Sequence, residues 1–96
     1  MRRAAKIDAN QPEIVAALRK VGAQVTSLAA VGEGVPDLLV GFRGETVLIE
    51  VKDGSKVKSA RQLTDDQIEW HAAWQGGRCV VAGSIAEALA AIGVAA

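Results

Sequence analysis

The chain has little of several residue types, and each scarcity removes a class of protein. It contains a single cysteine, Cys79, which excludes an intramolecular disulfide and a metal site built from cysteine clusters. No apolar stretch is long enough to cross a membrane as a helix. The positively charged start also lacks the apolar segment of a secretory signal. These features predict a cytoplasmic protein with no membrane partner.

Aromatic residues make up 3% of the chain and the formal net charge is zero, whereas half of the 96 residues are hydrophobic. This composition predicts one folded domain over residues 1–96, with an aliphatic core and a flexible basic arm at residues 1–9. The net charge of zero therefore gives no indication of a nucleic-acid partner. A local basic cluster at Lys56, Lys58 and Arg61 could contact phosphates, although such clusters are commonly just solvated surface.

Charged residues interrupt two otherwise apolar runs, 37–42 and 46–52. Both runs are rich in Val, Ile, Leu and Phe, which is typical of β-strands. Asp37 begins the first run, and Glu50 and Lys52 end the second. A charge buried in a strand is costly unless it is paired or holds a metal. These three residues are therefore the first place to look for chemistry.

The two runs are separated by Arg43-Gly44, which predicts a hairpin loop. A two-residue loop places Asp37 opposite Glu50, with their Cβ atoms about 5 Å apart. Lys52 shares that face because side chains alternate along a strand. Two facing carboxylates repel each other, and a magnesium or manganese ion would relieve the repulsion. A register shift of one residue would instead send the two acids to opposite faces.

The remaining elements follow from apolar periodicity and from turn residues. The pattern predicts an α/β domain of order αβββαβα, in which residues 53–63 form a lysine-rich surface loop. The first predicted helix starts with Asn10-Gln11-Pro12-Glu13, where Asn10 is the cap, and ends at Gly22. The other predicted elements are helices over 64–75 and 84–92 and strands over 23–28 and 78–82.

Pro36-Asp37 at a strand start, followed by Glu50-x-Lys52 on the next strand, resembles the PD-(D/E)XK nuclease superfamily. Gly34-x-Pro36-Asp37 and Gln67-x-x-Trp70 narrow the resemblance to the VRR-NUC branch, the virus-type replication-repair nucleases. This resemblance implies a restriction-endonuclease-like αβββαβ core. That core has a mixed central sheet flanked by helices, followed here by a C-terminal helix. The absence of an accessory domain resembles the stand-alone viral or phage form.

The resemblance also implies an activity, namely hydrolysis of DNA phosphodiesters by an endonuclease that uses Mg²⁺ or Mn²⁺. Branched DNA would be the substrate, as for Holliday-junction resolvases in repair and recombination, and a homodimer would be the working unit. Asp37, Glu50 and the Val51 carbonyl would hold the metal. Lys52 would act on the attacking water or the phosphate. Gln67 would help to position the site, and Glu13 would be an additional metal ligand.

Simpler interpretations exist for several of these residues. Thr64-x-x-Gln67 and Asn10-x-x-Glu13 both match a helix-capping box, which would explain Gln67 and Glu13 without an active site. Trp70 and Trp74 are four residues apart, which favours core packing over base stacking.

Two further side chains are expected to be structural. Cys79 is expected to be a small buried residue, and His71 a partly exposed one that is not placed to act as its base. Two other functions stay open for the chain as a whole. One is a nucleic-acid-binding module that does not cleave, and the other is a structural or inhibitor subunit.

Overall fold

A computed structural model of the chain describes residues 7–95. The expected order αβββαβα is confirmed, and a short 3₁₀ turn, η1, is added in the lysine-rich loop. Residues 1–6 of the expected basic arm lie outside the described residues, and 7–9 form neither helix nor strand. In chain order the elements are α1 (Gln11–Lys20), β1 (Gln24–Ser27), β2 (Leu38–Phe42), β3 (Glu45–Val51), η1 (Lys58–Arg61), α2 (Asp65–Ala73), β4 (Arg78–Ala82) and α3 (Ile85–Ala91).

The four strands form one mixed sheet in the order β1-β2-β3-β4. The pairs β1–β2 and β2–β3 are antiparallel, and the pair β3–β4 is parallel. A parallel pair needs a long crossover connection, and the segment containing η1 and α2 supplies it. The central strand β3 is therefore bonded on both edges, which fixes the position of every side chain that it carries.

The hairpin between β2 and β3 has the two-residue loop that the sequence predicts. Phe42 pairs with Glu45, and Leu38 pairs with Ile49. Arg43 and Gly44 both have positive φ angles, 49° and 81°, as a primed hairpin turn requires. The positive φ costs an arginine about 1 kcal/mol, and its guanidinium lies 4.8 Å from the centre of the Phe42 ring, which offsets part of that cost.

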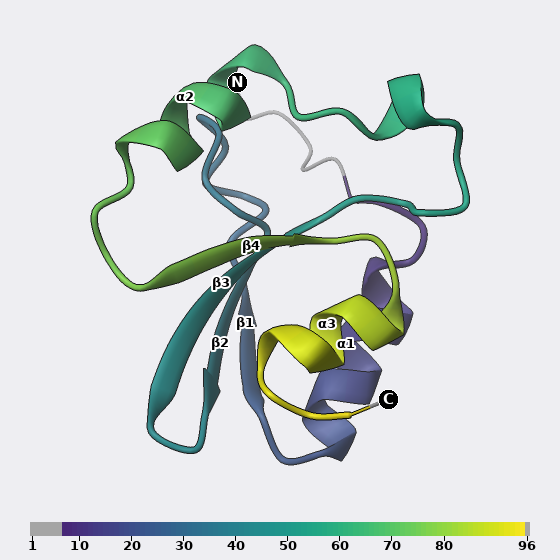
Figure 1. Cartoon of the computed structure of the whole chain (residues 1–96), viewed down its shortest axis with the longest axis vertical. Coiled ribbons are helices and arrows are strands. Elements are labelled where there is room, and N and C mark those ends of the chain that lie inside the picture. Colours follow the sequence, from purple (N-terminus) through teal and green to yellow (C-terminus); the bar gives the residue numbers. More distant parts are fainter. Residues whose placement is uncertain (1–6, 96) are drawn as a thin grey trace.

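One face of the sheet is covered by α1 and α3, which lie side by side against it (Figure 1). Ile14 and Leu18 are four residues apart on α1, so they share one helix face, and both are fully buried there. They pack against alternate side chains of the strands, which point to the same face because of the strand period of two. The sheet contributes Val25, Leu38, Val40, Val47, Ile49, Val51 and Ala82 to this core.

Helix α2 lies on the opposite side of the sheet and is much less buried (Figure 1). Every residue of α2 is exposed or half-buried, so the expected core packing of its tryptophans is wrong. Trp70 and Trp74 instead stack on each other at the surface, with ring centroids 5.0 Å apart and planes inclined by 15°. The helix ends at Ala73, and the Trp74 indole N–H donates to the Gly77 carbonyl at 2.8 Å. Each ring therefore covers part of the other, while Trp70 stays half-buried and Trp74 exposed.

No helix in residues 7–95 combines the length and the apolar character needed to cross a membrane.

Candidate active site

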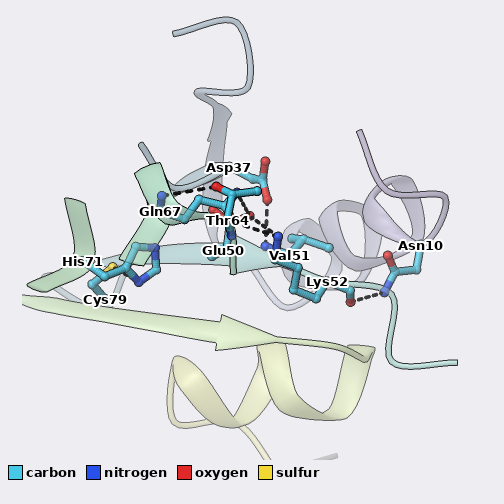
Figure 2. Close-up of polar contacts among 9 residues, drawn as sticks. All are labelled: Asn10, Asp37, Glu50, Val51, Lys52, Thr64, Gln67, His71 and Cys79. Carbon is cyan, nitrogen blue, oxygen red and sulfur yellow. Dashed lines mark hydrogen bonds and ion pairs between the residues drawn. The ribbon is translucent and has the colours of Figure 1, made fainter. Parts of the chain in front are cut away.

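The hairpin register brings Asp37 and Glu50 together. Leu38 pairs with Ile49, so continuing the register by one residue places Asp37 opposite Glu50. The Asp37 carboxylate accepts a hydrogen bond from the Val51 backbone N–H at 2.8 Å through Oδ2. This bond holds the aspartate against β3 and orients its carboxylate beside Glu50 (Figure 2).

Glu50 is the most buried charged residue of this cluster, with 2% of its surface exposed. Burial is the largest of the causes that together raise the pKa of Glu50 to about 8; the neighbouring Asp37 carboxylate adds to the increase, because it repels the ionised form and can accept a hydrogen bond from the protonated form. Lys52 acts in the opposite direction, and the charge of Asp8 adds a smaller increase. The Oε1 atom of Glu50 is buried and has no hydrogen-bond partner among the described residues. Near neutral pH this carboxyl therefore holds a proton that a cation could displace.

The Gln67 side chain, on α2, forms hydrogen bonds with both Glu50 and Lys52. Its Nε2 donates to Glu50 Oε2 at 3.1 Å, and its Oε1 accepts from Lys52 Nζ at 2.8 Å. The same Oε1 accepts from the Thr64 backbone N–H at 2.9 Å, and the Gln67 N–H donates to Thr64 Oγ1 at 3.3 Å. The capping box is therefore present. Capping and contact with the cluster are not alternatives here, because one amide does both.

Lys52 follows β3 directly, and its ammonium points back over the Glu50 carboxylate. Its Nζ lies 3.8 Å from Glu50 Oε2, and its side chain is 14% exposed. One hydrogen of the ammonium is engaged by Gln67, so the group has further hydrogens that can face a ligand. The alternation along the strand thus places the lysine on the Glu50 face, as the sequence predicts.

The loop before β2 explains the glycine and proline that precede Asp37. Gly34 has a φ of 83°, and a Cβ there would collide with the Asp66 carbonyl at the start of α2. Pro36, in the same loop, is fully buried. The loop before Asp37 therefore lies in close contact with the first turn of α2, which carries Gln67. This contact brings the Asp37 and Gln67 parts of the site together.

The donor set fits a hard divalent cation with few protein ligands. In residues 7–95 no group of three or more His, Cys, Asp or Glu is arranged to hold a metal. Mg²⁺ ordinarily keeps several waters and needs only one or two carboxylates. The unpartnered Glu50 Oε1 and the neighbouring Asp37 carboxylate supply such a pair, and the Val51 carbonyl adjoins them in sequence.

The chain is similar to a structure described as a VRR_NUC domain, with a TM-score of 0.62 and 24% sequence identity. The match covers 84% of this chain and 91% of the other. The chain has the VRR_NUC fold. No family model matches the sequence, and no curated protein matches it either.

The VRR_NUC fold expected from the sequence is thus confirmed, whereas Glu13 is not brought into the acidic cluster. Glu13 is exposed on α1 and lines a groove of about 850 Å³ between the first turns of α1 and α3. Neither Asp37 nor Glu50 lines that groove. The capping explanation for Glu13 also fails, because the Asn10 side chain makes no capping bond to α1. The proposed role of Glu13 in metal binding stays a prediction without support from its position.

Two polar residues near the start of α1 were not predicted from the sequence to lie near the site or in the core. Asp8 is close enough for its charge to raise the pKa of Glu50. Gln11 is 4% exposed, and its Oε1 has no partner in the described part of the chain. Gln11 lies three residues before Ile14 on the buried stripe of α1, so the helical spacing in the sequence could have predicted that Gln11 is buried.

Cys79 and His71 are neighbours, contrary to the expectation that the histidine is not placed near the thiol. Cys79 is half-buried, and its Sγ lies 3.7 Å from His71 Nδ1. Burial and the charge of Glu50 raise the pKa of the Cys79 thiol. Burial and the charge of Lys52 lower the pKa of His71. Both shifts favour the neutral forms, so this pair is not an activated thiolate.

The basic residues downstream of the site gather on one surface turn. Lys58 and Arg61 begin and end η1, and the Arg61 Nε donates to the Lys56 carbonyl at 2.9 Å. All three residues are exposed. Their position on one turn is compatible with phosphate contacts, and it leaves the predicted DNA-binding role open to experiment.

Proposed function

We propose that this protein is a metal-dependent endonuclease that hydrolyses DNA phosphodiester bonds. The observation that carries the proposal is the buried Glu50 carboxyl, which has one unpartnered oxygen and faces Asp37, with the Lys52 ammonium 3.8 Å away. A structural ion pair would not need a second carboxylate at this point. Two acids and a lysine at one strand end suit a reaction at a phosphate, where negative charge must be neutralised.

Mg²⁺ or Mn²⁺ would be held by Asp37, Glu50 and the Val51 carbonyl. When bound, such an ion neutralises phosphate charge and lowers the pKa of a coordinated water. Asp37 is already oriented by the Val51 N–H, so its carboxylate does not have to be ordered when the ion arrives. Glu50 must release its proton first, so binding competes with protonation below about pH 8.

Lys52 and Gln67 would act on the water and the phosphate. The Gln67 carbonyl oxygen fixes the lysine ammonium at 2.8 Å, which leaves the remaining hydrogens of Nζ free to meet a phosphate oxygen or the attacking water. Gln67 itself is held by the capping box at the start of α2. The ammonium is therefore preorganised, which is the property that electrostatic catalysis requires.

Structured or branched DNA and a homodimeric enzyme are part of the same proposal. A domain of 96 residues offers little surface for a branched duplex. Symmetric cutting of two strands needs two sites related by a two-fold axis. Light scattering at micromolar concentration should give a dimer mass, and a monomer whose cleavage rate is linear in enzyme concentration would contradict this part.

Cleavage of a panel of labelled DNAs tests the activity. Four-way junctions, flaps, linear duplex and single strands should be incubated with Mg²⁺, Mn²⁺ or Ca²⁺, with a chelator as the negative control. We expect cleavage with Mg²⁺ or Mn²⁺ and preference for a branched substrate. Salt-sensitive binding without cleavage under every condition would instead select a nucleic-acid-binding module of the same fold.

Comparing Lys52 with the basic turn separates chemistry from binding. Lys52→Ala should slow single-turnover cleavage by about 10²-fold or more, with little change in DNA affinity. The double variant Lys56→Ala/Lys58→Ala should weaken binding and reduce the slope of log affinity against log salt by about one unit per lost contact. Its cleavage rate should be nearly restored at saturating enzyme. Normal cleavage by bound Lys52→Ala protein would exclude a catalytic lysine.

A further inference from the structure

Asn10 occupies the N-cap position of α1, but its side chain does not serve the helix. Its backbone angles are helical, with φ −85° and ψ −5°, whereas a capping residue normally has β-region angles. Within the described residues, its side chain accepts no hydrogen bond from the first turn of α1. A residue type that is among the best helix caps is therefore used here for something else.

The Asn10 amide instead bonds two backbone carbonyls from other elements. Its Nδ2 donates to the Lys52 carbonyl at 3.1 Å and to the Gly83 carbonyl at 3.2 Å. These partners lie just after β3 and just after β4, 42 and 73 residues away in the sequence. A primary amide nitrogen carries two hydrogens, which is what two acceptors need. Figure 2 shows this contact on the side of Lys52 away from Gln67.

The two carbonyls belong to a short extension of the parallel ladder beyond the ends of the strands. The Lys52 N–H donates to the Ala82 carbonyl at 3.0 Å, and the Gly54 N–H donates to the Gly83 carbonyl at 3.0 Å. The two backbone segments approach so closely that a Cβ on Gly54 would lie 2.6 Å from the Gly83 oxygen. Asn10 closes this ladder, because it bonds the last carbonyl on each side.

We infer that Asn10 is a positioning residue for Lys52, which it holds in place from α1. Both backbone polar groups of Lys52 are then fixed, the N–H by β4 and the carbonyl by Asn10. The lysine lies beyond the last residue of β3, where the regular strand pairing no longer holds it. Misplacement of a catalytic group by about 1 Å can cost about 10²-fold in rate. The kinetic part of this inference rests on the proposed nuclease function, whereas the structural part does not.

Asn10→Asp tests the inference, because aspartate keeps the shape and the capping ability of asparagine but cannot donate. At saturating enzyme we expect single-turnover cleavage to fall by about 10²-fold, with DNA affinity within about twofold of the wild type. Ser84→Ala is the matched control, because it removes the hydrogen bond that caps α3 beside Gly83 without touching Lys52. It should lower stability but leave the rate unchanged. In a Lys52→Ala background, Asn10→Asp should add no further loss of rate.

Amide hydrogen exchange supplies a readout that does not depend on cleavage. In Asn10→Asp the Lys52 and Gly54 amides should exchange about tenfold faster than in the wild type, the equivalent of one lost hydrogen bond. Amides of β1, on the far side of the sheet, should not change. Asn10→Asp protein that cleaves at the wild-type rate, or that protects these amides normally, would overturn the inference. A wild-type protein that cleaves no DNA contradicts the proposed function instead, and the exchange measurement still decides whether Asn10 holds Lys52.

Discussion

The two faces of β3 are buried to a similar extent but are stabilised in different ways. On the face toward α1 and α3, Ile49 and Val51 are fully buried among aliphatic side chains. On the face toward α2, Glu50 is 2% exposed, and Gln67 and Lys52 bond it. Burial alone thus does not reveal what a position does. The polar face carries Glu50, a carboxyl with a raised pKa that can bind a cation. Because the buried carboxyl is disfavoured when ionised, it lowers the stability of the fold at high pH.

The largest expected effect lies on the polar face and concerns rate rather than folding. Glu50→Gln keeps the shape and removes the charge, so cleavage should fall by about 10³-fold or more, because the cation loses a ligand. DNA binding should persist, and the unfolding midpoint of the metal-free variant near pH 7 should rise, because glutamine is neutral without the proton that Glu50 must take up on folding. Single-turnover assays and thermal melts measure the two quantities on the same preparation. A variant that cleaves normally would remove Glu50 from the site.

On the aliphatic face the expected effect is the reverse, with loss of stability and no direct effect on chemistry. Ile49→Ala leaves a cavity in the core and should lower the free energy of unfolding by about 2–5 kcal/mol, as measured by urea denaturation. Any folded fraction should cleave at the wild-type rate per active site. A selective loss of rate in fully folded Ile49→Ala protein would show that the two faces are not independent.

The pH dependence of stability should separate the faces further. The pKa of Glu50 rises from 4.5 to about 8 on folding, so the folded state binds the extra proton between these values. Metal-free protein should therefore lose stability, on the order of several kcal/mol, as the pH rises from about 5 to about 8. Glu50→Gln should remove this slope, whereas Ile49→Ala should keep it. Denaturant melts in the presence of a chelator at several pH values provide the measurement.

The smallest expected effect tests whether capping and site contact by Gln67 can be separated. Thr64→Ala removes the hydroxyl that accepts from the Gln67 N–H and should cost about 1 kcal/mol of stability. It leaves the Gln67 side chain bonded to Glu50 and Lys52, so the cleavage rate should change little. Gln67→Ala should cost a similar amount of stability and also slow cleavage. Equal rates for the two variants would show that Gln67 serves only as a cap.

Several features of the site could be predicted from sequence because they depend on local geometry. The Arg43-Gly44 loop and the strand period together set the register that places Asp37 opposite Glu50 and Lys52 on the same face. The capping box at Thr64 is likewise a three-residue relation. The surface position of the tryptophans was missed, because helical spacing identifies residues on one face of a helix but not what that face meets.

By itself the sequence determined the order of the elements, the hairpin register and the two carboxylates beside a lysine, because turn chemistry and side-chain alternation act over a few residues. Only the tertiary structure decided how deeply Glu50 is buried, that Cys79 meets His71, and that Asn10 holds Lys52 instead of capping its helix. The contact of Asn10 with Lys52 spans 42 residues of sequence, and Cys79 and His71 lie on separate elements, β4 and α2, so each outcome depends on how elements pack against one another. The packing of α1 on one face of the sheet and of α2 on the other sets these contacts, and no local sequence pattern encodes that packing.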